Sequence, residues 1–267
     1  MSVRDLVDET AVPKARGRFD LRRAGTAVLY LAVVIGVWHL YVTLADVPQY
    51  LLPAPGAVAE SLAGLASSGE LWPHLGYTVR NIVIGLVSGV LIGCALGWVL
   101  ASSPRARMLL APYVVLFQAA PKIAVAPLLV LWFGLGLGSQ LTLVVMLAFF
   151  PMMIAMTLGL GEVTDDMRAL GRVLAMDRKR FLLRVQLPAA LPALFAGARI
   201  AVIDAMTGAF LAEYLSAKQG LGYLMVMGKS TYDTPQLLAA VLLTVVVGLT
   251  GFGLVGLAER IALPWRR

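Results

Sequence analysis

The stretch that comes closest to a catalytic motif lies near the C-terminus and contains two glycines and a lysine. Gly222 and Gly228-Lys229-Ser230 nearly match the phosphate-binding pattern GxxxxGK[ST], but one residue too many separates the two glycines. A phosphate loop needs that fixed spacing because its backbone N–H groups surround the phosphates. No β-strand pattern precedes the segment. We therefore expect no nucleotide to bind there.

Other reactive residue types are scarce and isolated. The chain has one cysteine, Cys94, inside an apolar run, and two histidines, His39 and His74, far apart in the sequence. No HExxH, CxxC or GxSxG pattern occurs, so neither a metal site nor a disulfide framework is expected. The sequence predicts no enzymatic activity, no metal and no cofactor. If ATP drives the protein, we expect another chain to bind and hydrolyse it.

The composition predicts an integral membrane protein. Hydrophobic residues make up 60% of the chain and charged residues 14%, well outside the range of soluble domains. The net charge of +7 does not indicate nucleic-acid binding, because the charges lie at the ends of apolar runs, where they set membrane topology.

Six apolar runs are long enough to cross a bilayer about 30 Å thick. They are Ala24–Leu44, Thr78–Ala101, Met108–Phe133, Ser139–Leu160, Ala189–Ala212 and Gln236–Ile261. The segments on one side of these runs carry 17 Lys and Arg residues, and those on the other side carry 2, Lys218 and Lys229. The positive-inside rule then places both termini in the cytoplasm. The sequence predicts a cytoplasmic tail over 1–23, uncleaved, and a six-helix membrane domain over 24–267.

The predicted second and third spans have special features. Gly85, Gly89, Gly93 and Gly97 form a ridge on the second span, which predicts close packing of another helix, within or between subunits. The third span contains Pro121 and Pro127 and must kink or break. Broken helices at membrane depth require protein or a water-filled cavity around the freed backbone. Outside the membrane, Ala57–Leu65 is expected to form a short interfacial helix.

Ionisable residues inside the predicted spans have two possible roles. Such residues usually face the interior of a helix bundle. In a structural role, Asp204 pairs with Arg80 or Arg199, and Lys122 extends toward the membrane surface. In a functional role, Lys122 faces a translocation cavity with Gln118. The candidate pathway residues are Gln118, Pro121, Lys122, Arg199 and Asp204.

One long polar insert, 162–188, interrupts the apolar runs. Leu170, Leu174, Phe181, Leu182 and Val185 recur at helical spacing among six basic residues, which predicts a basic helix with an apolar stripe. Asp165-Asp166 suits its start, and Leu187-Pro188 is expected to end it. We interpret the insert as a docking element for a cytoplasmic partner. The alternative is a basic loop held at the membrane surface by lipid charge.

Several motifs along the chain from about Leu51 occur together in a known family. They are Leu52-Pro53-Ala54-Pro55, Gly69-Glu70-Leu71-Trp72-Pro73-His74, Pro121-Lys122-Ile123-Ala124, Pro127-Leu128, Trp132-Phe133-Gly134-Leu135-Gly136, Leu187-Pro188-Ala189-Ala190-Leu191-Pro192, Gly197-Ala198-Arg199-Ile200, Ala212-Glu213 and Gly220-Leu221-Gly222-Tyr223.

With these motifs the chain resembles the permease subunits of binding-protein-dependent ABC importers. It is most similar to the nitrate, sulfonate, taurine and bicarbonate branch, which also includes permeases for thiamine-precursor pyrimidines. The resemblance implies an all-α fold with six transmembrane helices, of the type I importer permease kind, in a bacterial inner membrane. It implies a pair of ATPase subunits that bind ATP, a second permease subunit, expected to be an identical copy, and an external substrate-binding protein.

The resemblance also assigns the insert as the loop whose coupling helix docks on the ATPase subunit. Counted back from Leu187-Pro188, the family's Glu-Ala-Ala signature falls on Ala169, Leu170 and Gly171, and its glycine falls on Ala175. The glutamate and that glycine are therefore missing, and Arg168 or Arg172 is a candidate to take over the electrostatic part of the contact. Gly171 and Ala175 are expected to share one helix face. The docking residues implied are Arg168, Ala169, Leu170, Gly171, Arg172, Ala175, Met176, Asp177, Leu187 and Pro188.

A self-contained secondary transporter is the main alternative function. It predicts ion-coupling carboxylates at the middle of the membrane, for which only Asp204 is a candidate. Such transporters often show an internal repeat of two halves, and none is visible here. The substrate stays open between a small anion, such as a sulfonate, nitrate or bicarbonate, and a thiamine-precursor pyrimidine.

Overall fold

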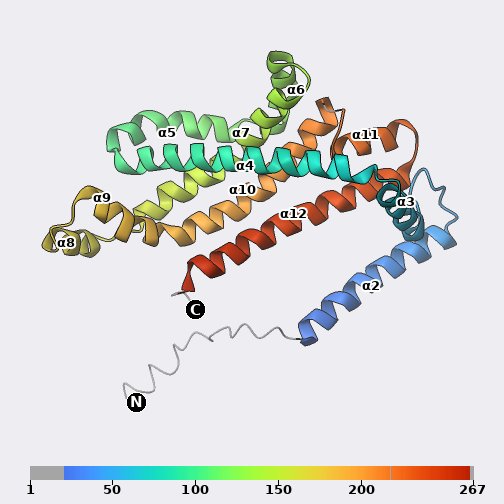
Figure 1. The fold of residues 1–267 in the computed structure, drawn as a ribbon, viewed down its shortest axis with the longest axis horizontal. Helices are drawn as coiled ribbons and strands as arrows, with labels where there is room; N and C mark the ends of the chain where they lie inside the picture. The colour runs from blue at the N-terminus through green and yellow to red at the C-terminus, as the bar shows by residue number, and fades with distance from the viewer. Residues whose placement is uncertain (1–20, 217, 265–267) are drawn as a thin grey trace. The chain divides into compact units, whose positions relative to one another are not determined.

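The computed structural model describes residues 21–216 and 218–264, and within them all regular structure is helical (Figure 1). The helices are α2 Leu21–Leu44, α3 Pro55–Ser67, α4 Leu71–Ser102, α5 Pro104–Ala119, α6 Lys122–Phe133, α7 Leu137–Gly161, α8 Asp165–Val173, α9 Arg178–Phe181, the π-helical segment η1 Leu182–Gln186, α10 Leu187–Ser216, α11 Leu221–Ser230 and α12 Thr234–Ala262. The chain forms two compact units, Met1–Pro48 with α2 and Gln49–Arg267 with all other helices. Most of the predicted tail, 1–23, lies outside the described residues.

The predicted spans correspond to helices of the structure. Within the described residues, four helical stretches are long and apolar enough to cross a membrane: α4, α7, α12 and the stretch Arg178–Ser216 that contains α10. Val28–Leu44 and Ala124–Phe133 are shorter apolar helices. The predicted third span is divided into α5 and α6, with the break at Ala120-Pro121. The break that the prolines predicted is therefore confirmed.

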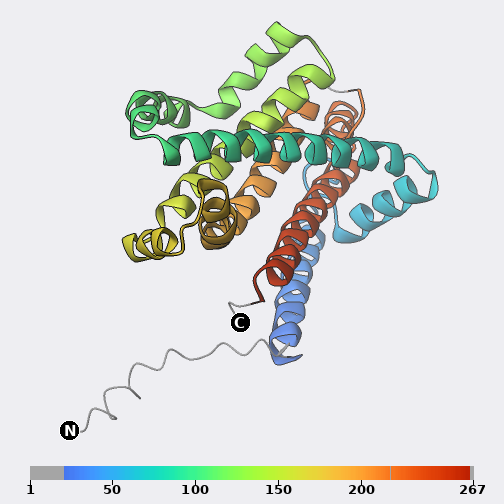
Figure 2. The same cartoon turned by 60° about the vertical axis from the view of Figure 1, so that its left-hand side comes forward.

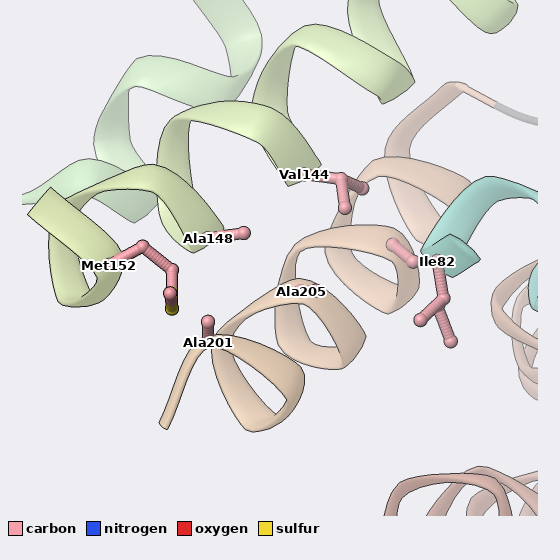
Figure 3. Close-up of a cluster of buried hydrophobic side chains, with 7 residues drawn as sticks. Ile82, Val144, Ala148, Met152, Ala201 and Ala205 are labelled. Carbon is pink, nitrogen blue, oxygen red and sulfur yellow. The ribbon is translucent and has the colours of Figure 1, made fainter. Parts of the chain in front are cut away.

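The core of the second unit lies between α4, α7 and α10. Figure 3 shows Val144, Ala148 and Met152 of α7 directed toward Ala201 and Ala205 of α10. Ile82 of α4 joins the same buried cluster. The small side chains on α10 let the helices approach closely. In lipid this close packing is the main source of helix association, since the surroundings are as apolar as the core.

The glycine ridge of α4 packs on α7. All four glycines are buried. A Cβ on Gly89 would lie 2.8 Å from Ala148 Cβ, and one on Gly97 would lie 2.7 Å from Met156 Cβ. The ridge is thus a packing surface within one subunit, one of the two roles that the sequence allowed.

The insert 162–188 is two helices joined by a turn, and not the single helix that its periodicity predicted. α8 begins at Asp165, as expected, with Thr164 as its N-cap. α9 continues through η1 into α10, so the prediction that Leu187-Pro188 ends the helix is wrong. In η1 the Leu187 N–H donates to Leu182 O, five residues back. In a regular α-helix the ring of Pro188 would clash with the carbonyl four residues back, and its missing N–H would leave that carbonyl without a donor. The wider turn of η1 accommodates the proline inside a continuous helix.

The two ends of the second unit differ in character. α8 and α9 form one end, and α3 and α11 lie at the opposite end (Figures 1 and 2). The expected helix at 57–65 is present as α3, which packs on α12. The basic insert and the segment after Glu213 are thus at opposite ends of the unit, as the topology prediction requires.

Candidate functional site

The turn between α8 and α9 is held by a set of backbone and side-chain hydrogen bonds. At the end of α8, the Met176 N–H donates to Gly171 O (3.0 Å) and the Ala175 N–H to Arg172 O (3.0 Å). This pair of bonds defines a Schellman motif. Asp177 then caps α9 by accepting from the Arg180 N–H at 2.8 Å. The loop therefore has a defined shape.

Gly171 and Ala175 do not share a helix face, so that prediction is wrong. Ala175 lies beyond the end of α8 and has a φ of +46°. Gly171 is buried, and a Cβ there would lie 2.7 Å from the ring of Phe181. The lack of a side chain at Gly171 thus lets α9 pack on α8 within the same loop.

The free surface of α8 carries an apolar stripe. It consists of Met167, Leu170, Val173 and Leu174, which are exposed; Leu170 is 59% and Val173 82% accessible. We call these four residues the α8 stripe. Arg168 and Arg172 are exposed on the same short helix. An amphipathic helix with its apolar side uncovered is typical of a docking surface.

Apart from the buried Gly171, the predicted docking residues divide into three groups. Arg168, Leu170 and Arg172 are exposed on α8, with Ala169 partly covered. Ala175, Met176 and Asp177 form the turn. Leu187 packs against a buried cluster at the end of α7, and Pro188 is half-buried in the continuous helix. Leu187 and Pro188 thus join the loop to the bundle.

The sequence reasoning missed two residues of the α8 stripe, Met167 and Val173. Both lie three residues from Leu170, so the helical period was the available signal. The predicted stripe instead extended through Phe181, Leu182 and Val185. In the structure these three are half-buried, and Phe181 covers Gly171. The turn at 174–177 divides the two sets.

Replacing Ala175 by glycine should stabilise the loop. A left-handed φ at an L-residue is unfavourable by about 1–2 kcal/mol, partly offset by the larger backbone entropy that glycine loses on folding. We expect Ala175→Gly to slow amide exchange at Ala175 and Met176, measured by hydrogen–deuterium exchange, by several-fold. Ala169→Gly is the matched control, because glycine inside α8 weakens the helix by about 1 kcal/mol. Faster exchange in Ala175→Gly than in the unchanged protein would contradict the strain at this residue.

The predicted pathway residues around the helix break are partly described. Gln118 lines a groove of about 420 Å³ between α5, α7 and α10. Pro121 is the N-cap residue of α6 and Lys122 is its first residue. The side chain of Lys122 lies outside the described residues. Gln118 therefore lines the groove and is close in the chain to the break.

The other two predicted pathway residues lie elsewhere on α10. Arg199 forms an ion pair with Glu259 of α12 and lies over the Phe252 ring, 5.3 Å from its centroid. Arg199 thus links α10 to α12 through Glu259, a partner that the sequence analysis did not name. Asp204 is half-buried. Arg80 lies 5.0 Å from the centroid of the Tyr77 ring. Arg199 and Asp204 are not among the residues that line the groove beside Gln118.

A buried polar network around Glu213 was not predicted. Glu213 is 1% exposed, and its carboxylate accepts from Thr78 Oγ1 at 2.8 Å. It also accepts from Asn81 Nδ2 (3.4 Å) and from the Gly222 N–H (3.2 Å). The network thus joins α4, α10 and the first turn of α11. A carboxylate near a helix N-terminus is also favoured by the helix dipole.

Further hydrogen bonds extend this network to α7 and to the turn before α11. Gln140 Oε1 accepts from Asn81 Nδ2 (3.1 Å) and from Tyr77 OH (3.0 Å). The Leu221 N–H donates to Thr78 Oγ1 (2.8 Å), and the Gly220 N–H donates to His74 Nδ1 (3.0 Å). Polar residues at helical spacing inside apolar runs were the signal for this cluster. Their mutual pairing is visible only in the fold.

The segment that resembles a phosphate loop is helix α11. A Cβ on Gly222 would lie 2.7 Å from Glu213 Cβ, and one on Gly228 would lie 2.8 Å from Asp233 O. Both glycines therefore allow close helix packing. The segment is helical from Leu221, so its backbone does not form a loop around a phosphate.

A bundle of helices long and apolar enough to cross a membrane defines a multi-pass membrane protein. The chain belongs to the family of binding-protein-dependent transport system inner membrane components, whose model matches residues 89–261. It is accordingly a permease subunit of an ABC importer, in the inner membrane. Membership of this family implies an ATPase and a substrate-binding protein as partners.

Relatives and solved structures agree with this assignment. The chain is 32% identical over 255 residues to the riboflavin transport system permease protein RibX of Chloroflexus aurantiacus, covering 95% of each chain. It is 30% identical over 259 residues to the taurine transport system permease protein TauC of Escherichia coli, covering 94% of each. A chain of the inward-facing MetNI methionine ABC transporter has the same fold, with a TM-score of 0.61 and 18% identity over 69% of this chain and 92% of that chain.

Proposed function

We propose that this permease subunit docks on its ATPase subunit through the α8 stripe and forms half of the translocation pathway with a second copy of itself. Both termini and α8 lie in the cytoplasm in this arrangement. The chain performs no chemistry on the solute, and its ATPase partner binds and hydrolyses ATP. The single observation that carries the proposal is the exposed α8 stripe on a loop of defined shape.

The energetics of the α8 stripe favour a protein partner. Fully burying one Leu, Val or Met side chain stabilises a contact by about 1.5–3 kcal/mol, and the stripe offers four such side chains. Arg168 and Arg172 have no ion pair with a carboxylate among the described residues. They are therefore available to a partner surface with acidic groups, which would increase the rate of association.

The continuous helix from α9 to α10 gives the docked loop a mechanical connection to the membrane bundle. Gly159 of α7 packs on Ala190, and a Cβ on Gly159 would lie 2.9 Å from that residue's Cβ. Helices packed as closely as α7 and α10 transmit a displacement, because such an interface has low compressibility. When ATP brings two ATPase subunits together, the loop moves with them and tilts α10. The result is a switch between inward- and outward-facing packings.

The opposite end of the unit, with α3 and α11, is the proposed contact surface for the binding protein. That end carries few basic residues, as expected for the external side. The solute then passes from this end along the helices that include Gln118, Pro121 and Lys122. The names of RibX and TauC specify riboflavin and taurine, so these two relatives leave the chemical class of the solute open.

A leucine-to-aspartate change in the α8 stripe tests the docking proposal. Leu170→Asp would place a charge in the buried contact, and we expect the amount of ATPase subunit that co-purifies with the tagged permease to fall at least tenfold. Tenfold corresponds to about 1.4 kcal/mol, less than the loss from one buried leucine. The matched control is Leu51→Asp, which changes a leucine of similar exposure, 64%, at the opposite end. That variant should keep the ATPase.

The alternative of a lipid-bound basic loop makes the reverse prediction. Lipid attraction depends on the charges of α9, and not on the α8 stripe. ATPase co-purification that is unchanged in Leu170→Asp would therefore reject the docking assignment. Equal loss in Leu51→Asp would show a general folding defect and would reject the specific role of α8.

A further inference from the structure

One face of α12 forms a seat for the side chain of Arg199 on α10. The Arg199 guanidinium pairs with the Glu259 carboxylate and lies 5.3 Å from the centroid of the Phe252 ring. Gly256 lies between these two residues, where a Cβ would already touch the guanidinium, 3.5 Å from Nη2. Phe252, Gly256 and Glu259 follow one another at four- and three-residue spacing and therefore share one helix face. α12 thus holds Arg199 by charge, by an aromatic ring and by shape.

The helices α7 and α10 are joined in a different way, by contact between their backbones. A Cβ on Gly159 of α7 would lie 3.0 Å from the backbone O of Ala190, and one on Gly197 of α10 would lie 3.1 Å from the backbone O of Pro151. An interface this close transmits a displacement without any charged group, because it has low compressibility. α7 therefore follows α10 through packing alone.

The contact between α10 and α12 is looser. Farther from α8 than Arg199, it consists of apolar side chains such as Val202, which lies against Gly251, and a groove of about 340 Å³ lies beside it between α4, α10 and α12. At Arg199 itself, a long and flexible side chain separates the two backbones. The spacing of α10 and α12 at this level therefore depends on the ion pair with Glu259.

This ion pair is better suited to orienting two helices than to stabilising the bundle. Arg199 Nε is buried and has no acceptor among the described residues, so the guanidinium is only partly satisfied. Desolvation offsets much of the attraction in a pair of this kind. Removing one partner, however, leaves the other charge without compensation. The pair therefore opposes any movement that separates α12 from α10.

We infer that Arg199 is a positioning residue for transport: through Glu259 it makes the adjoining part of α12 follow α10. This inference rests on the proposed function, in which the docked loop moves α10. α7 follows α10 through backbone contact, and α12 follows it through the ion pair. Without the pair, the ATPase subunits still move the loop and α10, but α12 stays behind.

Spin labels on the two helices measure whether α10 and α12 move together. In a Cys94→Ala background, Leu183→Cys places a label on η1, which continues into α10, and Ile261→Cys places one near the end of α12. Both side chains are exposed. With two identical copies in the importer, each variant gives one distance between equivalent labels. Double electron–electron resonance measures this distance in proteoliposomes, with the ATPase subunits bound, first without nucleotide and then with ATP and vanadate.

With the ion pair intact, we expect both distances to change when ATP and vanadate are added. Arg199→Gln and Glu259→Gln should each keep the change at position 183 and lose the change at position 261, because the remaining charge is uncompensated and no longer holds α12 to α10. The charge swap, Arg199→Glu combined with Glu259→Arg, should restore the change at 261. Arg80→Gln is the matched control. It removes an exposed arginine of α4 outside this contact and should keep both changes.

Several results would overturn the inference. It is wrong if the distance at 261 still changes in either single variant, or if the change at 183 is lost together with it, because Arg199 would then act on the whole bundle. If the single variants do not assemble with the ATPase subunits, the charge swap decides, and a swap that does not recover the change at 261 rejects the inference. A distance at 183 that stays constant with the pair intact would reject the proposed movement of α10 itself. A constant distance at 261 beside a changing one at 183 would reject only the role of Arg199.

Discussion

Replacing Gly93 in the middle of the α4 ridge is expected to separate α4 from α7. A Cβ on Gly93 would collide with the backbone O of Phe149 and would lie 2.9 Å from Met152 Cβ and 3.1 Å from Met153 N. Two of these three atoms belong to the α7 backbone, which cannot move aside without losing its own contacts with α10. Overpacking of this kind costs typically 1–3 kcal/mol and sometimes more. We expect Gly93→Ala to lower the thermal midpoint of the purified protein and Gly93→Val to prevent folding.

The matched control for this prediction is in the same helix. Gly76 has no atom within 4 Å of the place where its Cβ would be. Gly76→Ala should therefore stabilise α4 by up to about 1 kcal/mol, because alanine has the higher helix propensity. Thermal unfolding of the three variants in one detergent makes the comparison. If Gly93→Ala unfolds at the same temperature as the unchanged protein, α4 and α7 are not in the contact that the structure shows.

Removing the carboxylate of Glu213 is expected to release the first turn of α11. In Glu213→Leu the Thr78 hydroxyl, the Asn81 amide and the Gly222 N–H lose their shared acceptor. A buried donor without a partner costs about 1–3 kcal/mol, so three of them approach the whole stability of a typical domain. Glu213→Leu should make the turn at 218–221 sensitive to limited proteolysis. It should also abolish transport that depends on the binding protein, since α11 lies at the proposed contact surface.

Milder variants at the same network give a graded series. Glu213→Gln keeps one acceptor, and the Asn81 side-chain oxygen, which has no donor among the described residues, can turn toward the new amide. We expect Glu213→Gln to lower the free energy of unfolding by about 1–2 kcal/mol. Tyr77→Phe removes one hydrogen bond to Gln140 and should lower the free energy of unfolding by about 1 kcal/mol. If Glu213→Leu is no more sensitive to protease than Tyr77→Phe, Glu213 does not hold α11 in place.

Local patterns in the sequence determined which segments are helical and where the polar insert lies. Apolar runs long enough to span a bilayer are visible without tertiary information, because lipid requires that length and composition. The break at Pro121 followed from the missing N–H of proline. The glycine ridge followed from the four-residue repeat on one helix face. Each of these features depends on residues close together in the chain.

The features that sequence patterns did not reveal depend on contacts between helices or on the exact geometry of a turn. Which face of α8 stays free depends on Phe181, because its ring folds back and covers the face that contains Gly171. Pro188 stays inside a helix because η1 widens the preceding turn, a local geometry that periodicity does not reveal. Glu213 finds its hydrogen-bond donors 135 and 132 residues away, at Thr78 and Asn81. A sequence pattern records periodicity along one helix, whereas burial and hydrogen-bond pairing are properties of the contacts between helices.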